Sequence, residues 1–254
     1  MSVTMQWSLE HGMMVRRTGS GPTVVWIHGL GESSAGFEPV LPELQGYTHV
    51  LVDLPGYGRS PWPEDVVGLD EVAARLARWL ANEQPAVLVG HSMGGVLATF
   101  IAEIAPVRGV VNIDGNLTRG DCTFSGQAAS YSLADFRARG FDKVREQVYA
   151  DGAKHHELRG YHAAMYFAAP NVFHRHSLDL VELSTGDTLG PRLAALTVPK
   201  LFVAGVPGGV CGASRLRLDE LAIPWLSIEP AGHWVHLDQH ERFATAVDTF
   251  LMGT

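Results

Sequence analysis

A serine flanked by glycines, Ser92, lies in the sequence GHSMGG at residues 90–95. A short apolar run precedes this segment and a stretch of small and apolar residues follows it, which is the strand–turn–helix setting that a G-x-S-x-G nucleophile turn requires. Small residues at Gly90 and Gly94 permit a tight turn, which lifts the Ser92 hydroxyl over the edge of a sheet. The start of the next helix would favour an anion formed there. The pattern therefore predicts a nucleophilic serine.

Apolar runs on both sides of this segment predict the elements that would position it. Their continuous apolar character is typical of strands covered on both faces, as in a parallel sheet. Amphipathic or apolar helices are predicted between them, and such alternation with short loops indicates a doubly wound α/β fold. Strands are expected at 23–27, 49–53, 86–90, 109–113, 200–204 and 224–228, and helices at 70–80, 93–105 and 236–252.

The strand pattern is interrupted from about residue 116 to residue 196, where aromatic and histidine residues are frequent. Helical stretches are predicted there over 133–149 and 154–168. We therefore expect a helical cap at 116–196, inserted into a core domain made of 1–115 and 197–254.

Composition restricts the class of partner. The formal net charge of −8 argues against a surface for nucleic acid or for an anionic membrane, because both need clustered Lys and Arg. No apolar window is long enough to span a bilayer, and the first 19 residues do not form a secretory signal. Cys122 and Cys211 sit in no paired motif, as expected of free thiols in a reducing compartment. A cytoplasmic enzyme with a small-molecule substrate is expected, whether monomer or homodimer.

Four motifs together carry a resemblance to a known family. They are HGLG at 28–31, DLPGYGRS at 53–60, the serine turn at 90–95 and GHW at 232–234. The chain resembles the α/β-hydrolase superfamily, in the group of capped esterase-, lactonase- and dehalogenase-like enzymes, over nearly its whole length. The resemblance specifies the cap least. It implies the α/β-hydrolase fold, a mostly parallel doubly wound sheet with an inserted helical cap, and chemistry that needs no cofactor.

The resemblance also implies roles for individual residues. The residue after His-Gly and the residue after the nucleophile would supply the backbone N–H groups of an oxyanion hole, here Leu30 and Met93. His233 lies just after the last strand, where the family places its catalytic histidine. We expect His28 to brace its loop rather than act as a base.

The acid departs from the usual family pattern. The strand at 200–204 is followed by Gly, Val, Pro, Gly and Gly, and no carboxylate occurs before Asp219. The superfamily's other position for the acid is the end of the strand that follows the nucleophile helix, which here carries Asp114. Asp114 is therefore the predicted acid, with Asp121 and Asp187 as alternatives. Asp53 is expected to be structural.

The cap and the motif residues would line the substrate pocket. Histidines in the cap, such as the pair at 155–156 and those at 174 and 176, do not form a compelling metal-ligand pattern, so no metal is predicted. The expected pocket residues are His28, Gly29, His91, Tyr131, Tyr161, Tyr166 and Trp234.

These residues predict hydrolysis of a small-molecule carboxylic ester or lactone through an acyl-enzyme. A serine at position 92 disfavours haloalkane dehalogenases and epoxide hydrolases, which use an aspartate nucleophile. The same triad also serves C–C bond hydrolases, lyases, thioesterases and cyclases, so these stay as alternatives. A non-catalytic ligand-binding protein on this fold is the other alternative.

Overall fold

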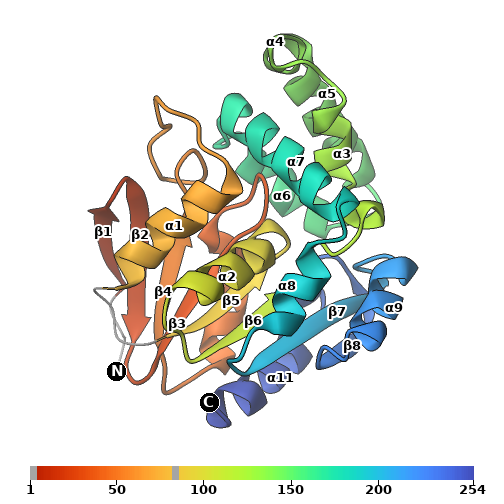
Figure 1. Ribbon diagram of the computed structural model, residues 1–254. Helices are drawn as coiled ribbons and strands as arrows, with labels where there is room; N and C mark the ends of the chain where they lie inside the picture. Colours follow the sequence, from red (N-terminus) through yellow and green to blue (C-terminus); the bar gives the residue numbers. More distant parts are fainter. Residues whose placement is uncertain (1–4, 82–85) are drawn as a thin grey trace.

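The apolar runs form one eight-stranded sheet in the computed structural model, which describes residues 5–81 and 86–254 (Figure 1). The order across the sheet is β1-β2-β4-β3-β5-β6-β7-β8, and all neighbours from β4 to β8 are parallel. The prediction of a mostly parallel, doubly wound sheet is confirmed. The strands are β1 Gln6–Glu10, β2 Met13–Gly19, β3 Thr23–Ile27, β4 Thr48–Asp53, β5 Val87–His91, β6 Gly109–Ile113, β7 Lys200–Gly208 and β8 Trp225–Gly232.

A hairpin that the apolar runs did not predict extends the sheet at one edge. β1 and β2 are antiparallel, and β2 pairs antiparallel with β4. The connection at His11 and Gly12 has φ of 50° and 78°, which suits the right-handed twist of a tight hairpin. β2 contains Arg16 and Arg17 in place of an uninterrupted apolar run, so its sequence does not signal a buried strand.

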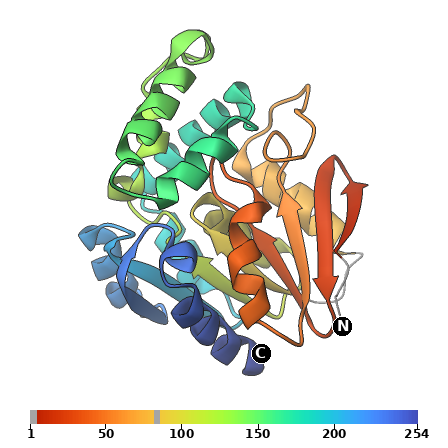
Figure 2. The same cartoon turned by 180° about the vertical axis from the view of Figure 1, so that it is seen from behind.

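Helices cover both faces of the sheet. Successive side chains of a strand point to opposite faces, so Leu88 of β5 packs in one core cluster and Val87 and Val89 in the other. Figure 1 shows α1, α2 and α8 on the first face, and the reverse view in Figure 2 shows η1 (orange) and α11 (dark blue) on the second. The helices of the core are η1 Ser34–Glu43, α1 Leu69–Leu80, α2 Met93–Ile104, α9 Gly212–Glu220, α10 Val235–Asp238 and α11 His240–Met252.

Between β6 and β7 the described chain forms helices joined by loops and no strand (Figure 1). α3 to α7 stand above the sheet as a group, whereas α8 packs against α2 of the core. We keep the cap boundaries of 116–196 as a proposal. The inserted elements are η2 Arg119–Asp121, α3 Phe124–Ala129, α4 Leu133–Asp135, the π-helical turn η3 Phe136–Gly140, α5 Phe141–Asp151, α6 Glu157–Met165, α7 Pro170–Thr185 and α8 Leu189–Ala195.

Strand register brings the predicted site residues to one edge. Ile27 of β3 is level with Gly90 of β5, and Gly90 is level with Asn112 of β6. The segments that follow these strands therefore leave the sheet side by side. None of the helices among the described residues has the length and apolar character of a membrane span.

Candidate active site

Ser92 occupies a strained turn between β5 and α2. Its φ of 54° and ψ of −119° lie in a region that side chains larger than glycine rarely adopt. Its N–H donates to the Ile113 carbonyl of β6 at 2.8 Å, which fixes the turn against the neighbouring strand. A Cβ at Gly90 would lie 2.1 Å from the Gly94 oxygen, and a Cβ at Gly94 would lie 2.0 Å from the Ile27 oxygen. Glycine is therefore required at both positions so that β3, β5 and α2 can pack this closely together.

Ser92 opens onto an inner cavity of about 30 Å³ between the sheet edge and the cap. Leu30 lines this cavity, whereas Met93 is buried at the first position of α2, where helix N–H groups have no partner within the helix. The complete lining is Leu30, Glu32, Ser92, Asn116, Asp121, Thr123, Phe124, Ser125, Tyr161, Leu180, His233 and Trp234.

His233 lies between the end of β8 and α10 and lines the same cavity. Its ring packs against those of His91, at 4.7 Å between centroids, and Trp234, at 5.2 Å. Burial, followed by the neighbouring His91 charge, lowers the pKa of His233 to about 3. The imidazole is thus neutral at pH 7, which is the form that accepts a proton. No hydrogen bond to this ring occurs among residues 5–81 and 86–254, and such bonds are often completed only in the substrate complex.

Asp114 follows β6 with a φ of 45° and is fully buried. Its Oδ2 accepts from the Gly205 N–H at 2.9 Å and its Oδ1 from the Val210 N–H at 2.8 Å. Burial raises the pKa of this carboxyl to about 7, although the two N–H groups and His91 act in the opposite direction. A Cβ at Gly209 would lie 2.3 Å from Oδ1. The carboxyl therefore fills the space beside the loop after β7.

Asp121 is a second carboxylate near the base. It lines the inner cavity, and its charge raises the pKa of His233 against the larger effect of burial. Its Oδ1 accepts from the Cys211 N–H at 2.9 Å, and its Oδ2 accepts from the Leu117 N–H at 2.9 Å and the Ser214 hydroxyl at 2.6 Å. These bonds join the start of the cap to the loop after β7.

Asp187 and Asp53, the other two aspartates named in the sequence analysis, do not line the inner cavity. Asp187 is an exposed partner of Arg217, at 2.7 Å. Asp53 accepts from the Ser34 N–H at 2.7 Å and the Arg59 N–H at 2.9 Å, so it organises a loop. His28 also braces backbone, because its Nε2 accepts from the Leu54 N–H at 3.0 Å.

The expected pocket residues from the cap and the histidine loop divide into two groups. Tyr161 and Trp234 line the inner cavity, with ring centroids 5.2 Å apart. The structure places Tyr166 at the surface, 57% exposed, with the Arg145 guanidinium 4.3 Å from its ring centroid. Tyr131 packs against Phe136 inside the cap. Its carbonyl accepts from the buried His174, and Tyr131 does not line the Ser92 cavity.

The motif residues Gly29 and His91 contact the site indirectly, because both bind Glu32, which lines the inner cavity. The Gly29 N–H donates to Glu32 Oε2 at 2.8 Å, and His91 Nδ1 lies 2.9 Å from Oε1. Sequence reasoning missed Glu32. An acidic residue among the small residues that follow the HGLG motif was the available signal.

An outer cavity of about 430 Å³ adjoins the inner one, because the two share the lining residues Asp121, Thr123, Phe124, His233 and Trp234. Its outer walls include Asp151, His155 and Glu157. His156, Glu157 and Asp238 present ligand atoms within 4.8 Å of one another, but Asp238 already accepts from the Gly232 N–H.

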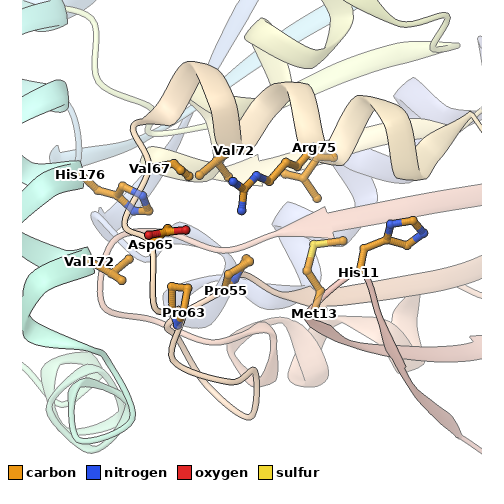
Figure 3. A pocket seen from close by; sticks show the side chains of 11 residues that line it. His11, Met13, Pro55, Pro63, Asp65, Val67, Val72, Arg75, Val172 and His176 are labelled. Carbon is orange, nitrogen blue, oxygen red and sulfur yellow. The ribbon is translucent and has the colours of Figure 1, made fainter.

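A separate apolar cavity of about 20 Å³ lies where the cap meets α1. Figure 3 shows Val172 and His176 extending from α7 toward the loop that carries Asp65 and Val67. The Tyr57 hydroxyl lies 2.9 Å from His176 Nδ1, and burial lowers the pKa of His176 to about 4. This cavity shares no lining residue with the Ser92 cavity, so it is separate from the candidate active site.

The chain is similar in sequence and in fold to known proteins. A pimeloyl-[acyl-carrier protein] methyl ester esterase of Shewanella oneidensis is 35% identical over 113 residues, which are 42% of this chain and 40% of that protein. The Xylella fastidiosa (strain M23) protein of the same name is 26% identical over 94% of this chain and 98% of its own length. A thermophilic esterase from Thermogutta terrifontis shares the fold, with a TM-score of 0.78 at 20% identity over 98% of each chain.

A model of the alpha/beta hydrolase family matches residues 24–246, which include every motif that carried the resemblance. The chain therefore belongs to the alpha/beta hydrolase family and is an enzyme of the hydrolase type.

Proposed function

We propose that this protein is a serine hydrolase that cleaves small-molecule carboxylic esters or lactones through Ser92, His233 and Asp114. One observation carries the proposal: a serine held in a strained turn shares a small cavity with a histidine that burial keeps neutral. Strained residues of this kind concentrate at functional sites. The name of the Xylella relative, a methyl ester esterase, supports ester chemistry.

The loop after β7 supports Asp114 as the acid. The usual family acid would lie near the end of this strand, where the chain carries Gly208 as the last residue of β7 and Gly209 as the first residue after it. The Asp114 carboxyl occupies the space that a side chain at Gly209 would need, and it accepts from the Gly205 N–H of β7 and the Val210 N–H of the loop. A carboxylate at this place would orient the His233 ring and stabilise the imidazolium formed during reaction.

The reaction proceeds in two halves. His233 accepts the Ser92 proton while Oγ attacks the carbonyl carbon, and the Leu30 and Met93 N–H groups stabilise the oxyanion. His233 then gives its proton to the leaving alcohol oxygen, and an acyl-Ser92 ester remains. Water attacks this ester with His233 as base, which releases the acid and restores the Ser92 hydroxyl.

The inner cavity predicts a preference for short acyl groups. Its volume of about 30 Å³ is room for one or two water molecules, and Phe124, Tyr161 and Leu180 form part of its wall. We expect kcat/KM for an aryl acetate to exceed that for the hexanoate by at least about 10-fold, since each misfit methylene in a pocket costs about 10-fold or more. The measurement is steady-state hydrolysis of a series of 4-nitrophenyl esters.

A Leu180→Ala variant tests the cause of that preference. Removal of this side chain from the cavity wall enlarges the cavity, so kcat/KM for the hexanoate should rise relative to that for the acetate. An unaltered acyl profile in Leu180→Ala, or a wild-type enzyme that prefers hexanoate, would show that the acyl group lies elsewhere.

A fluorophosphonate probe tests the covalent mechanism directly. We expect stoichiometric labelling that peptide mass spectrometry assigns to Ser92, followed by a comparison of aryl esters with lactones. Absence of labelling would favour a ligand-binding protein. Labelling without turnover of either substrate class would favour a C–C bond hydrolase, a lyase or a thioesterase on the same residues.

A further inference from the structure

One nearly buried carboxylate, Glu32, contacts all three segments that carry the proposed machinery. Its Oε2 accepts from the Gly29 N–H at 2.8 Å, next to the proposed oxyanion donor Leu30. Its Oε1 accepts from the Trp234 indole N–H at 2.8 Å, next to the proposed base His233. Its third partner is His91, next to Ser92. No other carboxylate in the described part of the chain bonds to all three segments.

His91 extends this contact. Its Nδ1 lies 2.9 Å from Glu32 Oε1 and 3.0 Å from Oε2, and its Nε2 lies 2.9 Å from the His233 carbonyl oxygen. Both ring nitrogens face acceptors, so both must carry a proton to satisfy them. The geometry therefore calls for an imidazolium beside a carboxylate.

The surroundings favour this charged pair. The Glu32 charge raises the pKa of His91 despite the opposing effect of burial, and His91 holds the pKa of Glu32 at about 2. The other titratable groups that face His91 are Asp114 of the segment after β6, His28 after β3, and His233 and His236 beyond β8.

We propose that Glu32 and His91 form a positioning ion pair, which holds the oxyanion loop, the serine turn and the histidine loop in register. This inference rests on the serine-hydrolase function proposed above. Charge as well as position matters, because Glu32 itself lines the inner cavity. A lone carboxylate there would repel the oxyanion, and the imidazolium offsets it.

The pair gives the activity a dependence on alkaline pH. His91 is charged below its raised pKa and loses its proton as the pH rises through that value. Above it, Glu32 is left without a counter-charge beside the oxyanion hole. We expect kcat of the wild type to decline at alkaline pH, separately from any acid decline caused by protonation of His233.

A Glu32→Gln variant tests the pair. We expect kcat on an aryl acetate to fall about 10–100-fold, as small misplacement of reacting groups does, with KM nearly unchanged. The alkaline decline should also disappear, because His91 without its carboxylate stays neutral. Rates are normalised to the fraction of Ser92 that the fluorophosphonate labels, which excludes misfolded protein.

Glu10→Gln is the matched control. Glu10 also accepts from a tryptophan indole, Trp79 Nε1 at 2.8 Å, and pairs with a cation, Arg17, but it lies on the edge strand β1. This control should alter thermal stability and leave kcat and its pH profile unchanged. If Glu32→Gln behaves in the same way as Glu10→Gln, the positioning role is wrong.

A His91→Gln variant separates charge from contact. It leaves Glu32 charged and without its cation, so it should lose more activity than Glu32→Gln. The double variant, which combines His91→Gln with Glu32→Gln, should recover part of that loss. A double variant slower than His91→Gln would overturn the charge argument. If Glu32→Gln does not fold, the pH profile of His91→Gln still tests the pair, because kcat of that variant should not decline at alkaline pH. A wild type that the probe does not label would instead refute the proposed function.

Discussion

Replacement of Ser92 by alanine is expected to lower kcat on an aryl ester by about 10⁴–10⁶, with KM changed little. The loss is large because the covalent route disappears altogether, and the remaining groups stabilise only the uncatalysed attack of water. The fold should survive. Alanine adopts the φ of 54° at this position with strain similar to that of serine, and the turn is fixed by the Ser92 N–H and its flanking glycines rather than by the hydroxyl.

Ser130→Ala is a suitable control, because Ser130 is an exposed cap residue whose hydroxyl bonds only locally, to the Gln127 carbonyl. It should retain wild-type kcat. Initial rates at saturating substrate, together with a thermal melt of each variant, separate chemistry from folding. A near-normal rate in Ser92→Ala would end the serine-hydrolase proposal, whatever the family membership of the chain.

The parts of the site that follow from local rules could be predicted from the sequence. Strands at 23–27 and 109–113 match β3 and β6, because continuous apolar runs of this length are buried wherever a parallel sheet forms. The Ser92 turn was equally accessible, since Gly90 is needed for a backbone contact with Gly94 inside the turn itself. The cap was expected only as a helical segment, and its last helix packs with the core.

The rest depends on contacts between segments far apart in the chain. Tyr131, Tyr161 and Tyr166 look alike in sequence, yet only Tyr161 reaches the inner cavity. Tyr161 lies on α6, whereas Tyr166 follows the end of that helix and Tyr131 lies between α3 and α4. The direction of each ring therefore depends on how α3 to α7 pack together. Glu32 was missed for the same reason: its partner Trp234 lies 202 positions away.

Removal of the Asp114 charge is the second large effect, and it tests the acid of the proposed triad. Asp114→Asn is expected to lower kcat by about 10³–10⁴, because an amide at the acid position orients the histidine in the wrong tautomer and does not stabilise the imidazolium. The substitution preserves size, so the contacts with the Gly205 and Val210 N–H groups remain partly satisfied. Titration of kcat over a pH range, with labelling of Ser92 as the measure of folded enzyme, distinguishes this loss from unfolding.

Two further aspartates complete the experiment. Asp187→Asn removes an exposed partner of Arg217 and should leave kcat unchanged. Asp121→Asn is the informative competitor, because Asp121 lines the cavity and acts on the pKa of His233, yet Leu117, Cys211 and Ser214 donate to its two oxygens. We expect this variant to lower stability, through the lost link between the cap and the loop after β7, far more than kcat. If Asp121→Asn loses several orders of magnitude while Asp114→Asn does not, the acid belongs to the start of the cap, and Asp114 serves only to order that loop.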